Sequence, residues 1–218
     1  MSSWTFPHST CERSLRGSVV QQPWSFGMNL VNAGLLMKDA VNESKTEPQM
    51  ALISFVIFEL VHAISHSVHL NRNIHEVSVH ICGYAMSITT YRVFQKKTGL
   101  KLTLAHKLPI LMMVITDLIV FSTIRGIYSI ATGLSVLALV VAIHIPSMSE
   151  QQQVRLLQLI VGTVVLFGMF VAENAYCDTF LKVNFNYHPL VVETWGIFLF
   201  QMLSKLIRDD SKKAIKLF

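Results

Sequence analysis

Charged residues and cysteines are scarce in this sequence. Asp, Glu, Lys and Arg make up 14% of the 218 residues, whereas 52% are hydrophobic, and the mean hydropathy is +0.48. This composition is too apolar for an ordinary soluble domain and indicates a membrane protein. The three cysteines form no metal-binding motif, and there is no repeat of fixed period, no low-complexity linker and no nucleic-acid motif. We therefore expect one membrane domain and no nucleic-acid partner.

Seven apolar segments are candidates for membrane spans. Each has roughly the 17–25 residues that a bilayer-crossing helix needs. Asn29 and Asn32 weaken the first segment, and Pro146 ends the fifth. We therefore expect an all-α integral membrane bundle of seven helices over residues 24–207. The predicted spans are 24–40, 50–70, 74–94, 108–124, 127–145, 157–176 and 190–207.

The distribution of Lys and Arg predicts the orientation of the bundle. If the N-terminal segment 1–23 is luminal or exterior, most basic residues fall in cytosolic loops and in a basic cytosolic tail, 208–218. These residues are Lys38, Lys45, Arg92, Lys96, Lys97, Lys101, Lys107, Arg155, Lys205, Arg208, Lys212, Lys213 and Lys216. The outer side then carries only Arg13, Arg16, Arg72, Arg125 and Lys182. This pattern suits the endoplasmic reticulum, the Golgi and the plasma membrane equally.

The second predicted span carries a polar stripe formed by Glu59, His62, His66 and His69. At 100° per residue these four positions fall within roughly 80° of arc on one helix face. A charged group at membrane depth costs about 2.5–3.5 kcal/mol on insertion scales, so such groups usually mark a functional site. The alternative is a cluster of neutral histidines that hydrogen-bond to one another and to neighbouring helices.

The predicted orientation brings further polar residues to the outer side. The third span starts there with His75, Glu76 and His80, and the sixth ends there with Glu173. The seventh begins there with His188, followed by Glu193. Five residues correspond to about 140° of rotation around an α-helix, so we expect His188 and Glu193 not to bind the same ion. His106 and His144 lie near the inner edge, and we interpret both as interfacial.

Several short motifs resemble those of the alkaline ceramidases, a family within the seven-span superfamily that includes the adiponectin receptors. The segment His62-Ala-Ile-Ser-His66 is similar to the family's Ser-x-x-x-His motif in the second span. His188 lies at the outer start of the seventh span, where the family has His-x-x-x-His. The remaining similarities are Cys11-Glu12 with Pro23-Trp24 and Asn29 at the entry to the first span, and His75-Glu76 near the family's Asp early in the third span. The resemblance implies a zinc-dependent hydrolase of ceramide or a related lipid amide, acting in sphingolipid metabolism.

The sequence also departs from the family pattern. His62 occupies the family's Ser position, and the second histidine of the seventh span is missing because residue 192 is Val. In the N-terminal segment Glu12 remains, but other positions that would supply calcium-binding carboxylates are neutral: Ser9, Ser14 and Gln22. These neutral residues argue against a calcium site.

The residues themselves favour zinc. Catalytic zinc takes three protein ligands and leaves one position for water. His62 and His66 are spaced i, i+4 on one helix, so both imidazoles can point at one ion, and His188 can supply the third ligand from another span. Glu76 or His75 can move the proton to the leaving amine. Glu59 either orients His62 or is a protonated residue of the bundle, and His69 and His80 are expected to line the site.

Two functions of different classes remain open. The first is an integral-membrane, zinc-dependent amide hydrolase with a ceramide-like substrate. The second is a non-enzymatic seven-helix protein, lipid-binding or receptor-like, whose site has lost its activity. A metal transporter is a weaker third possibility, because no polar column continues to the inner side. Cys11 and Cys177 both fall on the outer side, where disulfides persist, and are predicted to bond over the site.

Overall fold

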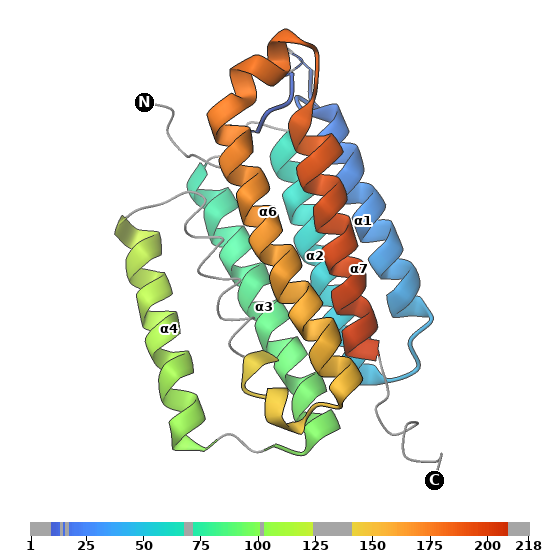
Figure 1. Cartoon of the computed structure of the whole chain (residues 1–218), viewed down its shortest axis with the longest axis vertical. Helices are drawn as coiled ribbons and strands as arrows, with labels where there is room; N and C mark the ends of the chain where they lie inside the picture. Colours follow the sequence, from blue (N-terminus) through green and yellow to red (C-terminus); the bar gives the residue numbers. More distant parts are fainter. Residues whose placement is uncertain are drawn as a thin grey trace.

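The computed structural model describes residues 10–13, 15, 18–67, 72–100, 103–123 and 141–208, and every regular element in this part of the chain is helical (Figure 1). A 3-10 turn, η1 (Ile145–Ser147), and a π-helical turn, η2 (His188–Glu193), accompany the longer helices. The expected all-α fold is therefore confirmed for these residues. The longer helices are α1 (Pro23–Val41), α2 (Thr46–Ser67), α3 (Arg72–Thr98), α4 (Leu104–Thr123), α6 (Glu150–Lys182) and α7 (Thr194–Arg208).

The helices agree with the predicted spans to different degrees. Each predicted span except the fifth overlaps a described helix, and most of the fifth lies outside the described residues. Three described stretches are long and apolar enough to cross a membrane: Thr46–Ser67, Glu150–Glu173 and His188–Arg208. The apolar character expected of a membrane protein is thus present in the folded helices.

Helix α6 is longer than the predicted span 157–176, because polar residues extend it at both ends. A capping box begins the helix: the Ser149 hydroxyl accepts from the Gln152 amide, and the Gln152 side chain accepts from the Ser149 amide. At the other end Asn184 adopts φ 57°, the left-handed conformation that commonly stops a helix. A hydropathy pattern cannot detect these polar turns.

The packed centre of the bundle consists of α1, α2, α3 and α7. Helix α2 packs against both α1 and α3, and α7 lies against α1, α2, α3 and α6 (Figure 1). Apolar side chains from all four central helices are fully buried here: Leu36, Leu52, Phe55, Met86, Phe94, Leu206 and Ile207. Asn29 and Asn32, which weaken the first span as an apolar segment, are also buried and face the other helices. Their polarity therefore belongs to the interior of the bundle.

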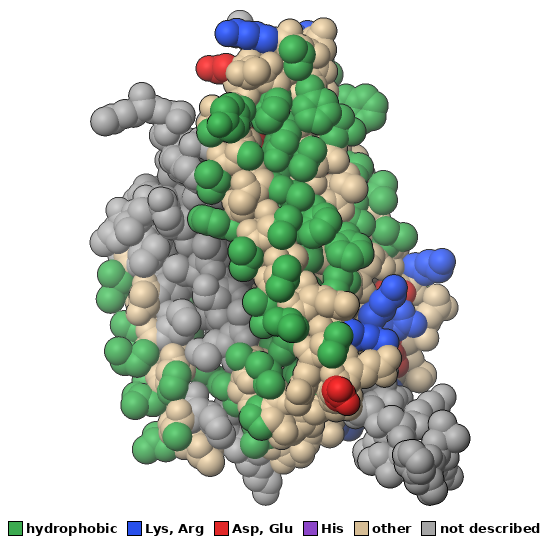
Figure 2. All heavy atoms as spheres, viewed as in Figure 1, with side chains coloured by type: hydrophobic (Ala, Val, Ile, Leu, Met, Phe, Trp, Pro, Cys, Tyr) green, Lys and Arg blue, Asp and Glu red, His purple; other side chains and the backbone are tan. Residues whose placement is uncertain are grey.

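Helix α6 packs closely on α7 along one side only. Gly162 permits this approach, since a Cβ there would come within 2.5 Å of Leu199, and the Trp195 indole donates to the Gly162 carbonyl at 2.8 Å. The outward face of α6 carries exposed apolar side chains, including Leu157, Val164 and Phe167. Figure 2 shows apolar side chains along the length of this face, with charged ones toward its ends. A face of this kind suits contact with lipid.

The bundle has two chemically different ends. The start of α1, the end of α2, the start of α3, the end of α6 and η2 form one end, which we call the site end. At the opposite end the Asp39 carboxylate accepts from Ser204 and Arg208, both at 2.5 Å. His144 also lies at the opposite end, where it is fully buried, stacks on Phe94 and bonds the Thr98 hydroxyl at 3.0 Å. Aromatic packing thus encloses the ring of His144. Its interpretation as interfacial concerns the membrane depth and stays a prediction.

Candidate metal centre

His62 and His66 project from the last turns of α2 into the site end. Their i, i+4 spacing places the two rings on one helix face, with centroids 5.1 Å apart. His66 is 1% exposed, and its Nδ1 lies 2.7 Å from the Gln22 side-chain oxygen. The Ser65 hydroxyl donates to the His62 carbonyl at 2.5 Å and is thereby turned away from this face. The predicted pair therefore has the geometry of two ligands on one helix.

His188 lies between two carboxylates at the start of η2. Its Nδ1 is 2.9 Å from both oxygens of Glu173 on α6, and its Nε2 is 3.0 Å from Glu193 Oε1. All three residues are buried. A carboxylate oxygen only accepts hydrogen bonds, so both ring nitrogens of His188 donate when both glutamates are ionised. In this arrangement neither nitrogen of His188 is directed at the two histidines of α2.

Glu193 reaches the same point from the other end of the π-helical turn. Its Oε1 lies 3.7 Å from His66 Nε2 and accepts from the Asn29 amide at 3.1 Å. The assumed α-helical rotation of about 140° between His188 and Glu193 is wrong, because the two side chains are in contact. The expectation that they do not bind the same ion stays a prediction. A π-helix bonds i to i+5 and has about 4.4 residues per turn, so residue i+5 lies near residue i on one face. Such turns often occur at functional sites.

His62, His66 and Glu193 form a group with the geometry of a metal centre. Their ligand atoms all lie within 4.8 Å of one another. Two atoms bound to zinc at about 2.0–2.2 Å are at most about 4.4 Å apart, so the 3.7 Å between His66 and Glu193 already suits one ion. Small side-chain rotations would bring the remaining distances into range. Two histidines and one glutamate are also a donor set found in catalytic zinc sites.

The sequence-predicted set of His62, His66 and His188 is brought together in space. The His66 and His188 rings have centroids 5.9 Å apart, although Glu193 stands against Nε2 of His188. Glu193 and Glu173 both contact His188, although neither belongs to the ligand set predicted from the sequence. Their positions at the predicted outer ends of the sixth and seventh spans were the only indication in the sequence.

The described residues just before α1, 10–13, 15 and 18–22, make several contacts at the site end. A disulfide joins Cys11 to Cys177 on α6, with Cα atoms 5.3 Å apart, which confirms the predicted bond. The Cys11 amide donates to Glu173 at 2.5 Å, and the His188 amide donates to the Cys11 carbonyl at 3.3 Å. The amides of Gln21 and Gln22 donate to the His66 carbonyl. Residues 10–22 therefore contact three of the groups that surround the centre.

Glu12, which follows the disulfide-bonded Cys11, caps α1. It accepts from the amides of Trp24 and Ser25 at 2.8 and 3.0 Å, and from the Ser25 hydroxyl at 2.5 Å. A carboxylate at a helix N-terminus satisfies amides that otherwise lack partners and interacts favourably with the helix dipole. Both oxygens of Glu12 are thus engaged by the protein.

Other polar side chains near the centre have structural partners. Glu59, one turn deeper on α2, is 2% exposed and accepts a hydrogen bond from Asn32. Of the two roles considered for Glu59, this contact favours a residue of the bundle interior. Burial, with the Glu173 carboxylate as the second cause, raises the pKa of Tyr187, whose ring stacks on Phe180 at 4.5 Å. The Tyr187 phenol is therefore neutral beside the site.

Several predicted site residues fall outside the described part of the structure. His69 lies between α2 and α3, and the side chains of His75, Glu76 and His80 are likewise not described. Their backbone positions are described for the last three, which belong to the first turns of α3 at the site end. Their roles as proton-transfer groups and lining residues stay predictions.

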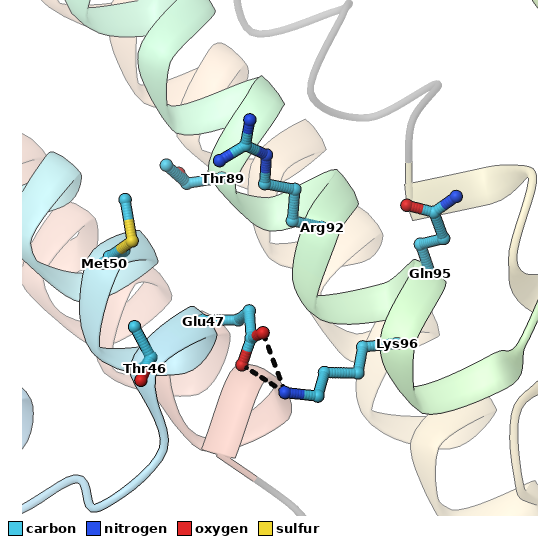
Figure 3. A pocket seen from close by; sticks show the side chains of 7 residues that line it. All are labelled: Thr46, Glu47, Met50, Thr89, Arg92, Gln95 and Lys96. Carbon is cyan, nitrogen blue, oxygen red and sulfur yellow. Dashed lines mark hydrogen bonds and ion pairs between the residues drawn. The ribbon is translucent and has the colours of Figure 1, made fainter.

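A cavity of about 430 Å³ lies at the opposite end, between the first turns of α2 and the last turns of α3 (Figure 3). Lys96 bonds both oxygens of Glu47 across its mouth, at 2.7 and 2.8 Å. His62 is 15 residues farther along α2 than Glu47, which at about 1.5 Å per residue is roughly 22 Å away. This cavity is separate from the candidate metal centre. Its lining residues are Thr46, Glu47, Met50, Thr89, Arg92, Gln95 and Lys96.

Comparison with known proteins identifies no family for this chain, since no family model, no curated protein and no solved structure matches it.

Proposed function

We propose that this chain is a multi-pass membrane hydrolase that binds zinc and cleaves the amide bond of ceramide or a related lipid, as its resemblance to the alkaline ceramidases implies. The observation that carries the proposal is the convergence of His62 and His66 with Glu193 and His188. Residues from opposite halves of the chain meet at one buried point, among helices apolar enough to contact lipid acyl chains. Ionisable groups gathered at such a depth favour a functional site over simple packing.

The chain's own residues suit amide hydrolysis. Zinc bound among His62, His66 and a ligand from η2 would supply Lewis acidity, lowering the pKa of a water molecule to about 7 and polarising the substrate carbonyl. Water adds to the carbonyl carbon, the C–N bond breaks, and a proton passes to the departing amine. We assign that transfer to Glu76 or His75, whose positions in the first turns of α3 lie at the site end.

Two substitutions test this function. His66→Ala should remove both zinc and hydrolysis of a ceramide, because it deletes a ligand. Glu76→Gln should leave zinc content unchanged and slow turnover by roughly 10²–10⁴-fold, as loss of an acid–base group does. Zinc is measured by elemental analysis of detergent-purified protein, and hydrolysis by release of the sphingoid base. Wild-type protein that stays metal-free after zinc loading would refute the proposal.

The same proposal includes seven spans, with the N-terminus in the lumen or outside the cell and the C-terminus in the cytosol. Two observations support it. The disulfide lies at the site end, as expected on an oxidising side, while Lys96, Lys97 and Arg208 lie at the opposite end. Protease protection of terminal tags tests this topology. Only the cytosolic C-terminal tag should be cleaved in sealed vesicles, and equal protection of both tags would contradict an odd number of spans.

A non-enzymatic, lipid-binding or receptor-like role is the second candidate. The observation that favours it is the enclosure of His188, whose two ring nitrogens are both bonded to carboxylates. If this candidate is correct, the purified protein takes up no zinc and hydrolyses no lipid amide, yet it binds ceramide-like lipids. Zinc uptake by the wild type therefore separates the two functions.

A further inference from the structure

We infer that Glu193 supplies the third metal ligand, and that His188 positions Glu193 instead of binding the ion itself. This inference rests on the proposed function, because it concerns the same zinc site. It replaces the set of His62, His66 and His188 with His62, His66 and Glu193. The centre thereby changes from three neutral ligands to two neutral ligands and one anionic ligand.

The first argument is the geometry of the two candidate ligands. Glu193 belongs to the group whose ligand atoms lie within 4.8 Å of one another, and its Oε1 is 3.7 Å from His66 Nε2. His188 meets the same region with its Nε2 already 3.0 Å from Glu193. Binding of an ion by His188 would require that contact to break. Glu193 has a second carboxylate oxygen, so it can bind an ion while Oε1 keeps its hydrogen bonds to His188 and Asn29.

The second argument is the support around Glu193. Its Oε1 accepts from His188 on one side and from Asn29 of α1 at 3.1 Å on the other. His188 is in turn held by both oxygens of Glu173, which also accepts from the Cys11 amide. Metal-binding carboxylates and histidines are typically oriented by a surrounding layer of hydrogen bonds of this kind. In this hydrogen-bonded series Glu193 thus has the position of a metal ligand, and His188 and Glu173 have the positions of supporting residues.

The third argument is the backbone. An α-helix would place residue 193 about 140° from residue 188, and the position one turn after His188 is the apolar Val192. The π-helical turn η2 brings Glu193 to the face of His188. The turn therefore supplies a carboxylate where α-helical geometry offers only a valine. π-Helical turns are rare and frequently occur at functional sites.

The electrostatic balance supports the same assignment. The centre gathers the carboxylates of Glu173 and Glu193 in a region with side-chain exposures of 5% and 10%. Buried charges require paired partners, and His188 alone stands between these two. A divalent cation at Glu193 would offset the second negative charge.

The experiment compares zinc affinity and ligand type in four purified full-length variants. Glu193→Gln keeps the side-chain size but removes the anionic oxygen, so zinc affinity should fall by more than about 100-fold. His188→Gln should weaken zinc by about 10–100-fold, the usual effect of losing a supporting residue. Glu193→Asp retains a carboxylate and should restore part of the affinity lost in Glu193→Gln. His144→Gln, a buried histidine at the opposite end, should leave the affinity unchanged.

Chelator competition measures the affinities, and X-ray absorption at the zinc edge counts the imidazole ligands. We expect two imidazoles in the wild type and two in His188→Gln. Three imidazoles in the wild type, or loss of one in His188→Gln, would overturn the inference and restore His188 as a ligand. Unchanged zinc affinity in Glu193→Gln would also overturn it. Both results leave the zinc hydrolase proposal standing, whereas a wild type without zinc refutes that proposal as well.

Discussion

Buried histidines occur at both ends of the bundle, but their surroundings differ. His144 is 0% exposed at the opposite end, where the Thr98 hydroxyl and aromatic rings surround it. His188 is 3% exposed at the site end, between two buried carboxylates. A polar partner and a stacked ring accompany the buried imidazole of His144. Packing alone does not require two carboxylates around one histidine, as at His188. The carboxylates therefore distinguish the candidate site better than the burial of a histidine does.

The largest stability difference between the two ends is expected at Glu173. Glu173→Leu removes the acceptor of both His188 Nδ1 and the Cys11 amide. Loss of one partner from a buried charged pair typically costs about 3–5 kcal/mol, and we expect a loss of that size in detergent unfolding. Glu173→Gln retains hydrogen-bonding capacity and should lose less. Equal stability of Glu173→Leu and wild type would show that the site end is not a coupled network.

An intermediate effect is expected from the disulfide at the site end. Cys177→Ser opens a loop of 166 residues, and native disulfides typically contribute about 2–4 kcal/mol. Thermal unfolding with and without reductant measures the effect. Reductant should lower the melting temperature of the wild type and leave Cys177→Ser unchanged. If zinc affinity also falls in Cys177→Ser, residues 10–22 orient the ligands as well as stabilise the fold.

The smallest effect is expected at the opposite end. Asp39→Asn weakens the ion pair with Arg208, whose side chain is 33% exposed against 20% for Asp39. Partly exposed pairs contribute about 0.2–1 kcal/mol, so the change in unfolding free energy should lie in that range. Zinc content should stay at the wild-type level. A loss of zinc in Asp39→Asn would mean that the two ends are energetically coupled.

The coarse fold and part of the site could be read from the sequence. The apolar segments predicted the helices, and the i, i+4 spacing of His62 and His66 predicted two side chains on one face. The disulfide was predicted from the side of the membrane assigned to Cys11 and Cys177. The first two inferences succeeded because helix periodicity and helix length are properties of a local segment. The disulfide required only that two cysteines from distant segments lie at the same end of the bundle.

The contact of Glu193 with His188 could not be predicted in the same way. A hydrophobic pattern assumes one rotation per residue, and nothing in His188-Pro-Leu-Val-Val-Glu193 identifies a π-helical turn. The role of Glu173 also depends on how α6 packs beside η2, which involves residues that are not adjacent in sequence. The burial of His144 depends on long-range packing in the same way, because Phe94 and Thr98 belong to α3. Long-range packing decided these three environments.

The bond between Cys11 and Cys177 also fixes the order in which the protein can mature. Cys177 is synthesised 166 residues after Cys11, so the bond cannot form before the ribosome has made most of the chain. Both thiols must then reach the same oxidising compartment. The contacts of Cys11 with Glu173 and His188 become permanent only at that stage. The disulfide therefore completes the surroundings of this centre only after residue 177 has been made.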